Sequence, residues 1–520
     1  MKTPYESGGT ERLTWEQLRE GFVCPDWFAD ARLGIWVHWG AQTQPELGGG
    51  WYARHMYMTD VGRETWGEDA YRYHCETYGH PSEKGFKDVA HEWKAEKLDT
   101  DDLLAYFKGL GAKYFVALAN HHDHFDNFDS THHPWNSVNV GPKRDIIGEF
   151  AASAKKHGVP FGVTSHDDRF QNWWLPAFGA DPDGPKAGVP YDGHMTAADG
   201  KGEWWEGLNP QDLYGLPPEQ RGDDWLDEIG DLYMRRHTEL VEKYDIDMLW
   251  FDGHGFPYDT YGREVCTALY NRSLRQNGRI SSVVVGKFHD REPSCIEDVE
   301  RGAAPEMRPL PWQGTLTFGS WFYKGDRPIR HDGRTVIEML CDMISKNGNL
   351  LLNVELLPDG TVPPEQKPIY DAIGAWVNLH SEAVHGSRPW AIHGDNLNSH
   401  LKSEKGSAIG EVDLEHAATQ QATHFNERTV DSPMFGHDEV RFTTKGESLY
   451  VCVLNPAAGP IQLPSLGLDS PQKPGRVTAV RALGCDVLVP FAQDENALQL
   501  DVPASRPTPH AAVFEVRGAL

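Results

Sequence analysis

Short apolar runs alternate with segments of helical periodicity over the first 390 residues of the chain. Each run is closed by polar residues or glycine, as expected for buried strands of a parallel sheet. The runs cover residues 33–39, 114–119, 161–164, 248–251, 280–285, 316–321 and 350–354. Between them, residues 145–154 and 232–244 repeat apolar positions at the spacing of one helix face. Alternating strands and helices imply parallel pairing, and seven or eight such units predict an α/β fold, a (β/α)8-like TIM barrel.

The pattern changes beyond residue 390. Short alternating runs, such as 448–454 and 511–516, are punctuated by Gly, Ser, Asn and Thr and predict a small antiparallel β-sandwich. We therefore expect a catalytic barrel at residues 1–390 and a C-terminal β-sandwich at 391–520. Residues 171–225 are rich in Gly, Pro, Asp and Trp and follow a predicted strand, which favours an active-site loop.

Composition narrows the class of ligand. The 49 basic and 77 acidic residues give a net charge of -28, which disfavours nucleic acid and anionic membranes as partners. Aromatic residues make up 11% of the chain and often stand beside His and Asp, a combination suited to a neutral sugar. The seven cysteines show no CxxC spacing, so neither a zinc ribbon nor a disulfide framework is predicted.

The chain has no apolar run of membrane-spanning length and no signal-like start. We therefore expect a soluble protein, either cytoplasmic or secreted with its leader removed. Whether it forms a homo-oligomer is left open by the sequence.

Four of the predicted strands end in residues capable of chemistry. The residues at these ends are His38, His121, His122, His166 and Asp252. In a parallel barrel all strand ends of one direction converge on one rim, so their joint occurrence predicts a shared active site. Each one alone has a simpler explanation, because Asp-Gly is a common turn and a single His is more often a packed residue.

Two kinds of enzyme fit such a rim. A metal hydrolase would bind its ion through His38, His121, His122 and a carboxylate, and would use bound water as the nucleophile. A retaining glycosidase would attack the anomeric carbon with Asp252, while a second carboxylic acid about 5 Å away protonates the leaving oxygen. Neighbouring strand residues face opposite sides, so joint ligation by His121 and His122 requires the strand to end before them, and no HExxH motif is present.

Ordered blocks between residues 15 and 390 closely resemble those of the α-L-fucosidases of glycoside hydrolase family 29. The blocks are 33–40 (LGIWVHWG), 51–57 (WYARHMY), 121–123 (HHD), 135–137 (WNS), 141–145 (GPKRD), 250–253 (WFDG), 347–354 (NGNLLLNV), 358–363 (PDGTVP) and 386–390 (GSRPW). The resemblance implies a retaining exo-hydrolase of terminal α-L-fucosyl residues, or of a closely related L-sugar, on oligosaccharides. It also implies a barrel followed by a β-sandwich, with no metal or other cofactor.

The resemblance assigns roles to individual residues. Asp252 matches the nucleophile that forms the covalent glycosyl-enzyme intermediate. The position of the acid/base varies in the family. Glu300 is our first choice because it follows the fifth predicted strand, Glu297 is the alternative, and Asp298 and Glu306 rank after them.

Residues around the sugar are expected at the same rim. His38, His121 and His122 match family residues that hold sugar hydroxyls, and Trp321 matches an aromatic ring beside the apolar face of the sugar. Further substrate-binding residues expected there are Trp51, His166, Trp250 and Lys287.

Several positions depart from the family pattern. Gly50 stands where the family has Glu, His124 where it commonly has Gly, and His166 lies in a segment where it has Tyr-Tyr-Ser. Lys287 replaces an Arg, and Gln313 replaces a Glu. These changes leave the nucleophile in place and reshape the pocket that reads the sugar. They also keep a third hypothesis open, a non-catalytic carbohydrate-binding protein on a glycosidase scaffold.

Overall fold

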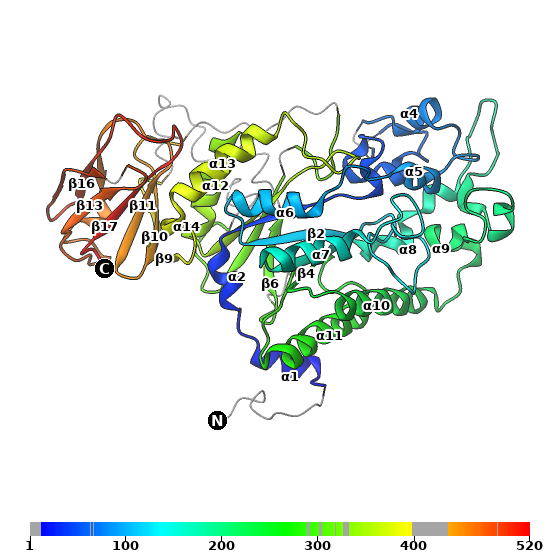
Figure 1. Cartoon of the computed structure of the whole chain (residues 1–520), viewed down its shortest axis with the longest axis horizontal. Coiled ribbons are helices and arrows are strands. Elements are labelled where there is room, and N and C mark those ends of the chain that lie inside the picture. The colour runs from blue at the N-terminus through cyan, green and yellow to red at the C-terminus, as the bar shows by residue number, and fades with distance from the viewer. Residues whose placement is uncertain are drawn as a thin grey trace.

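A computed structural model describes residues 12–62, 64–65, 67–288, 292–300, 304–317, 319–325, 332–397, 435–485 and 487–520. Eight parallel strands form a closed barrel in chain order (Figure 1). They are β1 (Leu33–Val37), β2 (Tyr114–Asn120), β3 (Phe161–Ser165), β4 (Met248–His254), β5 (Val283–Lys287), β6 (Ile296–Glu300), β7 (Trp312–Leu316) and β8 (Gly348–Asn353). Pairing of β8 with β1 closes the barrel, which confirms the predicted fold class.

Alternate residues of six of the eight strands enter two separate apolar cores. Trp36, Trp250 and Val285 pack together inside the barrel. Leu249 and Val284 join the outer core between the strands and the surrounding helices. Because a strand buried on both faces is mostly apolar, β1 to β5 read as nearly continuous hydrophobic runs.

Fourteen helices are present in the described part of the chain. They are α1 (Trp15–Gly21), α2 (Asp26–Ala31), α3 (Tyr52–His55), α4 (Ala70–Thr77), α5 (Phe86–Glu92), α6 (Thr100–Gly109), α7 (Ile146–His157), α8 (Phe170–Trp173), α9 (Pro210–Tyr214), α10 (Trp225–Lys243), α11 (Thr260–Asn277), α12 (Gly333–Ser345), α13 (Lys367–Leu379) and α14 (Ser381–Val384). The predicted helix at 145–154 is α7, which Asp145 caps by accepting from Gly148 N at 3.0 Å and which ends before the left-handed Gly158. No helix among the described residues is long and apolar enough to cross a membrane.

Two strand predictions need correction. The run predicted as a strand at 316–321 is placed too late, because the strand is Trp312–Leu316 and the chain leaves the sheet after its pairing with β8. Residue 318 of that run lies outside the described residues. Strand β6 was not among the predicted strands, because three of its five residues are acidic.

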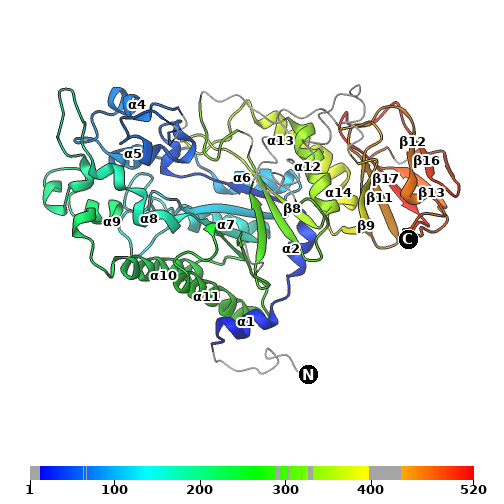
Figure 2. The ribbon, with the colours of Figure 1, turned by 180° about the vertical axis from the view of Figure 1, so that it is seen from behind.

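The C-terminal part of the chain forms two packed antiparallel sheets. One has the order β14-β13-β17-β11-β10-β9 and the other β12-β16-β15, and their apolar residues share one core. The strands are β9 (Arg388–Asp395), β10 (Val440–Lys445), β11 (Ser448–Val453), β12 (Gly459–Leu463), β13 (Ala479–Ala482), β14 (Val487–Leu488), β15 (Phe491–Gln493), β16 (Leu498–Val502) and β17 (Ala512–Arg517). Figure 2 shows this sandwich beside α12 and α14, at the opposite end of the molecule from α8 and α9.

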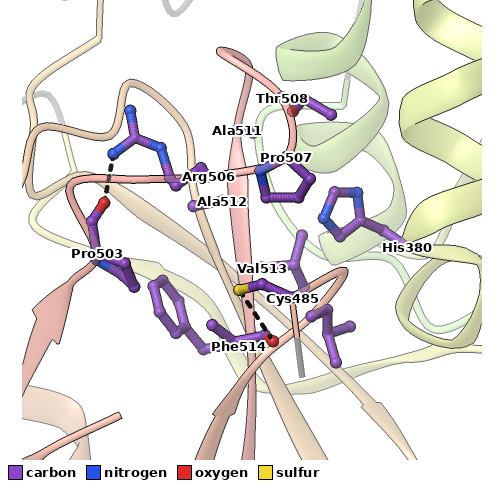
Figure 3. A pocket seen from close by; sticks show the side chains of 12 residues that line it. His380, Cys485, Pro503, Arg506, Pro507, Thr508, Ala511, Ala512, Val513 and Phe514 are labelled. Atoms are coloured by element: carbon purple, nitrogen blue, oxygen red, sulfur yellow. Dashed lines mark hydrogen bonds between the residues drawn. The ribbon is translucent and has the colours of Figure 1, made fainter. Parts of the chain in front are cut away.

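The sandwich is attached to the barrel by buried polar contacts. The Arg441 guanidinium bonds Asp342 of α12 at 2.7 Å, and the Trp376 indole donates to the Ala511 carbonyl at 2.7 Å. A cavity of about 20 Å³ lies at this junction between His380 and the sandwich (Figure 3). Such a volume holds about one water molecule, so the junction offers no room for a sugar.

Candidate active site

The register of β4 aims the predicted nucleophile into the barrel. Trp250 belongs to the inner core, and Leu249 and Phe251 belong to the outer core. Because strand side chains alternate, Asp252 is the next residue to face inward, at the carboxyl end of the strand. A residue at this position lies on the rim where (β/α)8 barrels carry their active sites.

Neighbouring strands deliver their last residues to the same rim. His38 stands two residues beyond the inward-facing Trp36, and Lys287 two residues beyond the inward-facing Val285. On β6, Val299 packs in the outer core, so the alternation turns Glu300 inward and Glu297 outward.

Lys287 joins two carboxylates of this rim. Its Nζ lies 2.5 Å from Asp252 Oδ1 and 2.5 Å from Glu300 Oε2. Because both oxygens contact one nitrogen, they are no further apart than the roughly 5 Å that separates the carboxyl groups of retaining glycosidases. Lys287, expected to bind substrate, therefore lies between the two carboxylates.

The other acidic candidates lie elsewhere. Glu297 pairs with Arg308 on the outer side of β6. Asp298 faces inward below the rim, where it is buried and accepts from Gln313 at 2.9 Å. Glu306 is exposed on the segment before β7.

Asp252 is ionised although it is buried. Burial disfavours its charge, but the Lys287 ammonium and a hydrogen bond from the His166 ring outweigh that effect and hold its pKa well below the ordinary value. Burial also opposes the charge of Lys287, yet Asp252 and Glu300 raise its pKa above the ordinary range. The rim thus holds an ionised carboxylate, Asp252, beside a protonated amine, Lys287.

The two neighbouring histidines both reach the pocket because β2 ends at Asn120. The ring centres of His121 and His122 are 4.3 Å apart. His122 Nε2 lies 3.4 Å from Asp252 Oδ2, and His166 Nδ1 lies 3.5 Å from the same oxygen. Two of the predicted histidines therefore lie against the predicted nucleophile, and His121 packs beside one of them.

Hydrogen bonds determine which ring nitrogens of His121 and His122 are donors and which are acceptors toward the pocket. His122 Nδ1 bonds the backbone carbonyl of His166, which leaves Nε2 as an acceptor in the neutral ring. Gln42 accepts from Ala53 N, so its amide nitrogen donates to His121 Nδ1 at 2.9 Å and leaves Nε2–H as a donor. The pocket thus presents one acceptor and one donor side by side, as a sugar hydroxyl requires.

Burial keeps the four histidines of the rim uncharged. It lowers the pKa of His122 to about 3 and places the pKa values of His38, His121 and His166 below the ordinary value. Both ring nitrogens of His38, and Nε2 of His166, are buried and have no hydrogen-bond partner within the described ranges. Buried polar atoms of this kind cost free energy and indicate a polar ligand.

The same rings are close enough to hold a cation. One nitrogen each of His38, His121 and His166 lie within 4.8 Å of one another, and so do atoms of His122, His166 and Asp252. The predicted metal set of His38, His121 and His122 is thus split between two groups. Either group suits a divalent ion by its donors, so metal dependence calls for a direct test.

Aromatic rings border the histidines. Trp36 packs on Trp321 at 5.3 Å and on Trp250 at 5.4 Å, and Trp51 packs on Trp173 at 4.8 Å. The predicted Trp250 and Trp321 thus share Trp36, whereas the predicted Trp51 borders His122, with ring centres 5.8 Å apart. Trp173 was not singled out in the sequence, although it lies in the segment predicted as an active-site loop.

Phe322 was also missed, although it directly follows Trp321. Its ring lies 4.7 Å from His38 and 5.2 Å from His121, measured between ring centres. A Cβ at Gly50 would meet this ring at 2.8 Å, and Gly50 has a φ of +105°. The ring of Phe322 therefore occupies the space that a side chain at position 50 would need.

A fully buried arginine fastens the strand ends that carry the histidines. Arg236 of α10 bonds Asp126 beyond β2 at 2.5 Å and Asp167 beyond β3 at 2.6 Å. His124 bonds Asp167 at 2.8 Å, so the unusual histidine at position 124 belongs to this network. Only the departure at His124 signalled the network in the sequence, since Arg236 lies more than 100 residues away.

A closed parallel barrel with two carboxyl groups on its rim, neutral imidazoles and bordering indoles is the arrangement of a retaining glycoside hydrolase. The family model described as alpha-L-fucosidase matches residues 5–382 of the chain. The chain therefore belongs to the α-L-fucosidase family, and it is an enzyme of the glycoside hydrolase class.

Individual relatives agree with the family model. Tissue alpha-L-fucosidase of Rattus norvegicus is 28% identical over 394 residues, which cover 73% of this chain and 74% of the relative. The alpha-L-fucosidase of Dictyostelium discoideum is 24% identical over 392 residues, covering 74% and 76%. The Thermotoga maritima alpha-fucosidase in complex with fucose shares the fold, with a TM-score of 0.66, 23% identity and coverage of 96% and 99%.

We expect Arg236→Met to destabilise the protein by about 3–5 kcal/mol, because it leaves two buried carboxylates without their cation. Arg235→Met is the matched control, since Arg235 is exposed and pairs only with Asp231 among the described residues. Urea unfolding of both variants measures the difference. Equal stability of the two variants would show that the buried network contributes nothing.

Proposed function

We propose that the protein is a retaining exo-α-L-fucosidase that hydrolyses terminal α-L-fucosyl residues of oligosaccharides through a covalent intermediate. Asp252 is the nucleophile and Glu300 the acid/base in this proposal. The observation that carries it is the pair of carboxylates on one lysine, both at the barrel rim. The substrate follows from the family and from relatives named alpha-L-fucosidase.

In the first step, Asp252 Oδ2 attacks the anomeric carbon while Lys287 holds Oδ1. The bond to the leaving oxygen breaks, and Glu300 gives its proton to that oxygen. The product is a glycosyl ester of Asp252. The neutral rings of His121 and His122 bind sugar hydroxyls without adding charge to the site.

In the second step, Glu300 takes a proton from water, whose oxygen attacks the anomeric carbon and releases Asp252 as a carboxylate. While the ester lasts, Asp252 carries no charge. Of its two carboxyl partners, Lys287 then retains Glu300 alone and holds this side chain in place to act as the base. The shared lysine therefore positions both reacting carboxyl groups.

The remaining pocket residues complete the proposal. His38 and His166 contribute hydrogen bonds to the sugar, and the rings of Trp51, Trp250 and Trp321 contact its apolar faces. We propose further that residues 1–390 form the catalytic domain and that the sandwich of residues 391–520 supports it. The contacts of Arg441 and Trp376 with their partners favour this supporting role.

Asp252→Ala should lower kcat for an aryl α-L-fucoside by a factor on the order of 10⁴ or more, because no other group can form the ester. Circular dichroism and Tm should match wild type. An Asp252→Ala enzyme that keeps a tenth of wild-type activity would remove the nucleophile assignment.

Glu300→Ala should slow release of poor leaving groups by about 10²–10⁴-fold and of good ones much less, since only the former need a proton. Azide should restore part of the lost rate, because this anionic nucleophile attacks the glycosyl ester in place of water and needs no base in the second step. Glu297→Ala is the control from the outer face of the same strand, and it should leave both substrates near wild type. The reverse pattern would transfer the acid/base role to Glu297.

Dialysis against a chelator separates this proposal from the metal hypothesis. The carboxylate mechanism needs no cation, so activity on the aryl α-L-fucoside should stay within error of the untreated enzyme. A loss that added Zn²⁺ restores would instead assign the histidine groups to a catalytic ion.

A further inference from the structure

Asp168 is a third carboxyl group close to the nucleophile, and none of the roles above uses it. It lies in the turn that follows β3, two residues beyond His166. Its Oδ1 is buried and has no hydrogen-bond partner in the described part of the protein. A carboxylate oxygen without a donor is costly in such a place, whereas a protonated carboxyl group has less charge to solvate.

The position of Asp168 is tied to the nucleophile by packing. A Cβ at Gly253 would lie 2.3 Å from Asp168 Oδ2, so the residue after Asp252 must be small to accept this carboxyl group. His122 lies between the two acids, with Nε2 3.4 Å from Asp252 and Nδ1 3.7 Å from Asp168. Its Nδ1 proton already goes to the His166 carbonyl, so it does not neutralise Asp168.

Charged groups on each neighbouring element act on Asp168. Asp252 on β4 opposes its ionisation, Lys287 on β5 and Arg169 on its own turn favour it, and Asp167 opposes it more weakly. Burial and the charge of Asp252 prevail and raise the pKa of Asp168 to about 7. The uncharged ring of His122 completes its surroundings.

We propose that Asp168 is a substrate-binding residue that works in its protonated form, donating a hydrogen bond to the sugar hydroxyl next to the anomeric carbon. The side chain is 18% exposed, so it is not sealed from the pocket although Oδ1 is buried. A hydroxyl on the carbon beside the reaction centre is the group nearest to an acid that packs against Asp252-Gly253. In retaining glycosidases, hydrogen bonds to this hydroxyl strengthen in the transition state.

The inference rests on the proposed fucosidase function, and it predicts a pH signature. As pH rises through about 7, Asp168 loses its donor proton and places a second negative charge beside Asp252. Glycosylation of Asp252 should then slow. Asp168→Asn keeps a donor of similar shape and carries no charge, so it isolates the effect of ionisation.

Hydrolysis of an aryl α-L-fucoside by wild type, Asp168→Asn and Asp168→Ala should be measured from pH 5 to 9. We expect Asp168→Asn to keep kcat/KM within about threefold at pH 6 and to retain more activity than wild type at pH 8. Asp168→Ala should lose about 10- to 100-fold, the worth of a transition-state hydrogen bond. An alkaline limb that is unchanged in Asp168→Asn would overturn the proposal.

The 2-deoxy analogue of the aryl fucoside tests which hydroxyl is bound. The loss in Asp168→Ala should largely disappear on this substrate, because the hydroxyl partner is already missing. An equal loss on both substrates would exclude this contact and leave Asp168 a structural residue.

Thermal unfolding supplies a readout that does not depend on turnover. An acid whose folded-state pKa is raised destabilises the protein progressively as pH rises from its unfolded value near 3.9 to beyond the folded value. Asp168→Asn should therefore raise Tm at pH 8 and leave it unchanged at pH 4, whereas the exposed control Asp183→Asn should change neither. A Tm at pH 8 that Asp168→Asn does not raise contradicts the protonated carboxyl group. If wild type hydrolyses no fucoside, the proposed function fails, and the Tm series still decides whether Asp168 is protonated.

Discussion

The ion pairs of Lys287 with Asp252 and Glu300 are the contact on which the rest of the site depends. Two carboxylates within roughly 5 Å of each other repel strongly when they are shielded from water, and a buried cation between them removes that cost. The barrel makes this possible because β4, β5 and β6 are consecutive parallel neighbours, and each presents an inward-facing residue at its carboxyl end. Closure of the sheet therefore sets the spacing of the chemistry.

Burial keeps the histidines around Lys287, Asp252 and Glu300 uncharged. A second ion network holds the strand ends that carry them in place. Four histidines border the pocket as neutral rings, so they offer donors and acceptors to a sugar without competing for Asp252. The strand ends that carry these rings are fastened from behind by Arg236, which binds acids beyond both β2 and β3. Arg236 is thus paired with its acids, whereas among the described residues the ring nitrogens of His38 and Nε2 of His166 are unpaired at the rim, where a hydroxyl can bind.

Much of this arrangement could be predicted from the sequence because the barrel strands are apolar on both faces and end in chemistry-bearing residues. Asp252, His38 and His166 were found that way. Strand β6 was missed because two of its inward-facing residues are acidic, so the preference for Glu300 over Glu297 rested on the family resemblance and not on side-chain direction. The packing of Val299 in the outer core shows that Glu300 faces inward and Glu297 outward.

Contacts between segments that are distant in the sequence could not be predicted either. Phe322 fills the space beside Gly50, and Asp168 packs on Gly253, yet neither pair shares a sequence pattern. Which side chain fills the space beside a glycine can be seen only in the three-dimensional structure.

In the proposed mechanism, Asp252 becomes covalently bonded to the sugar. Incubation with a 2-deoxy-2-fluoro-L-fucosyl fluoride, followed by proteolysis and mass spectrometry, tests it most directly, because the fluorine slows breakdown of the ester more than its formation. We expect one added deoxyfluorofucosyl mass per chain, on the peptide that contains Asp252. A label on a different carboxylate, or complete turnover of the reagent with no adduct and no inactivation, would contradict it.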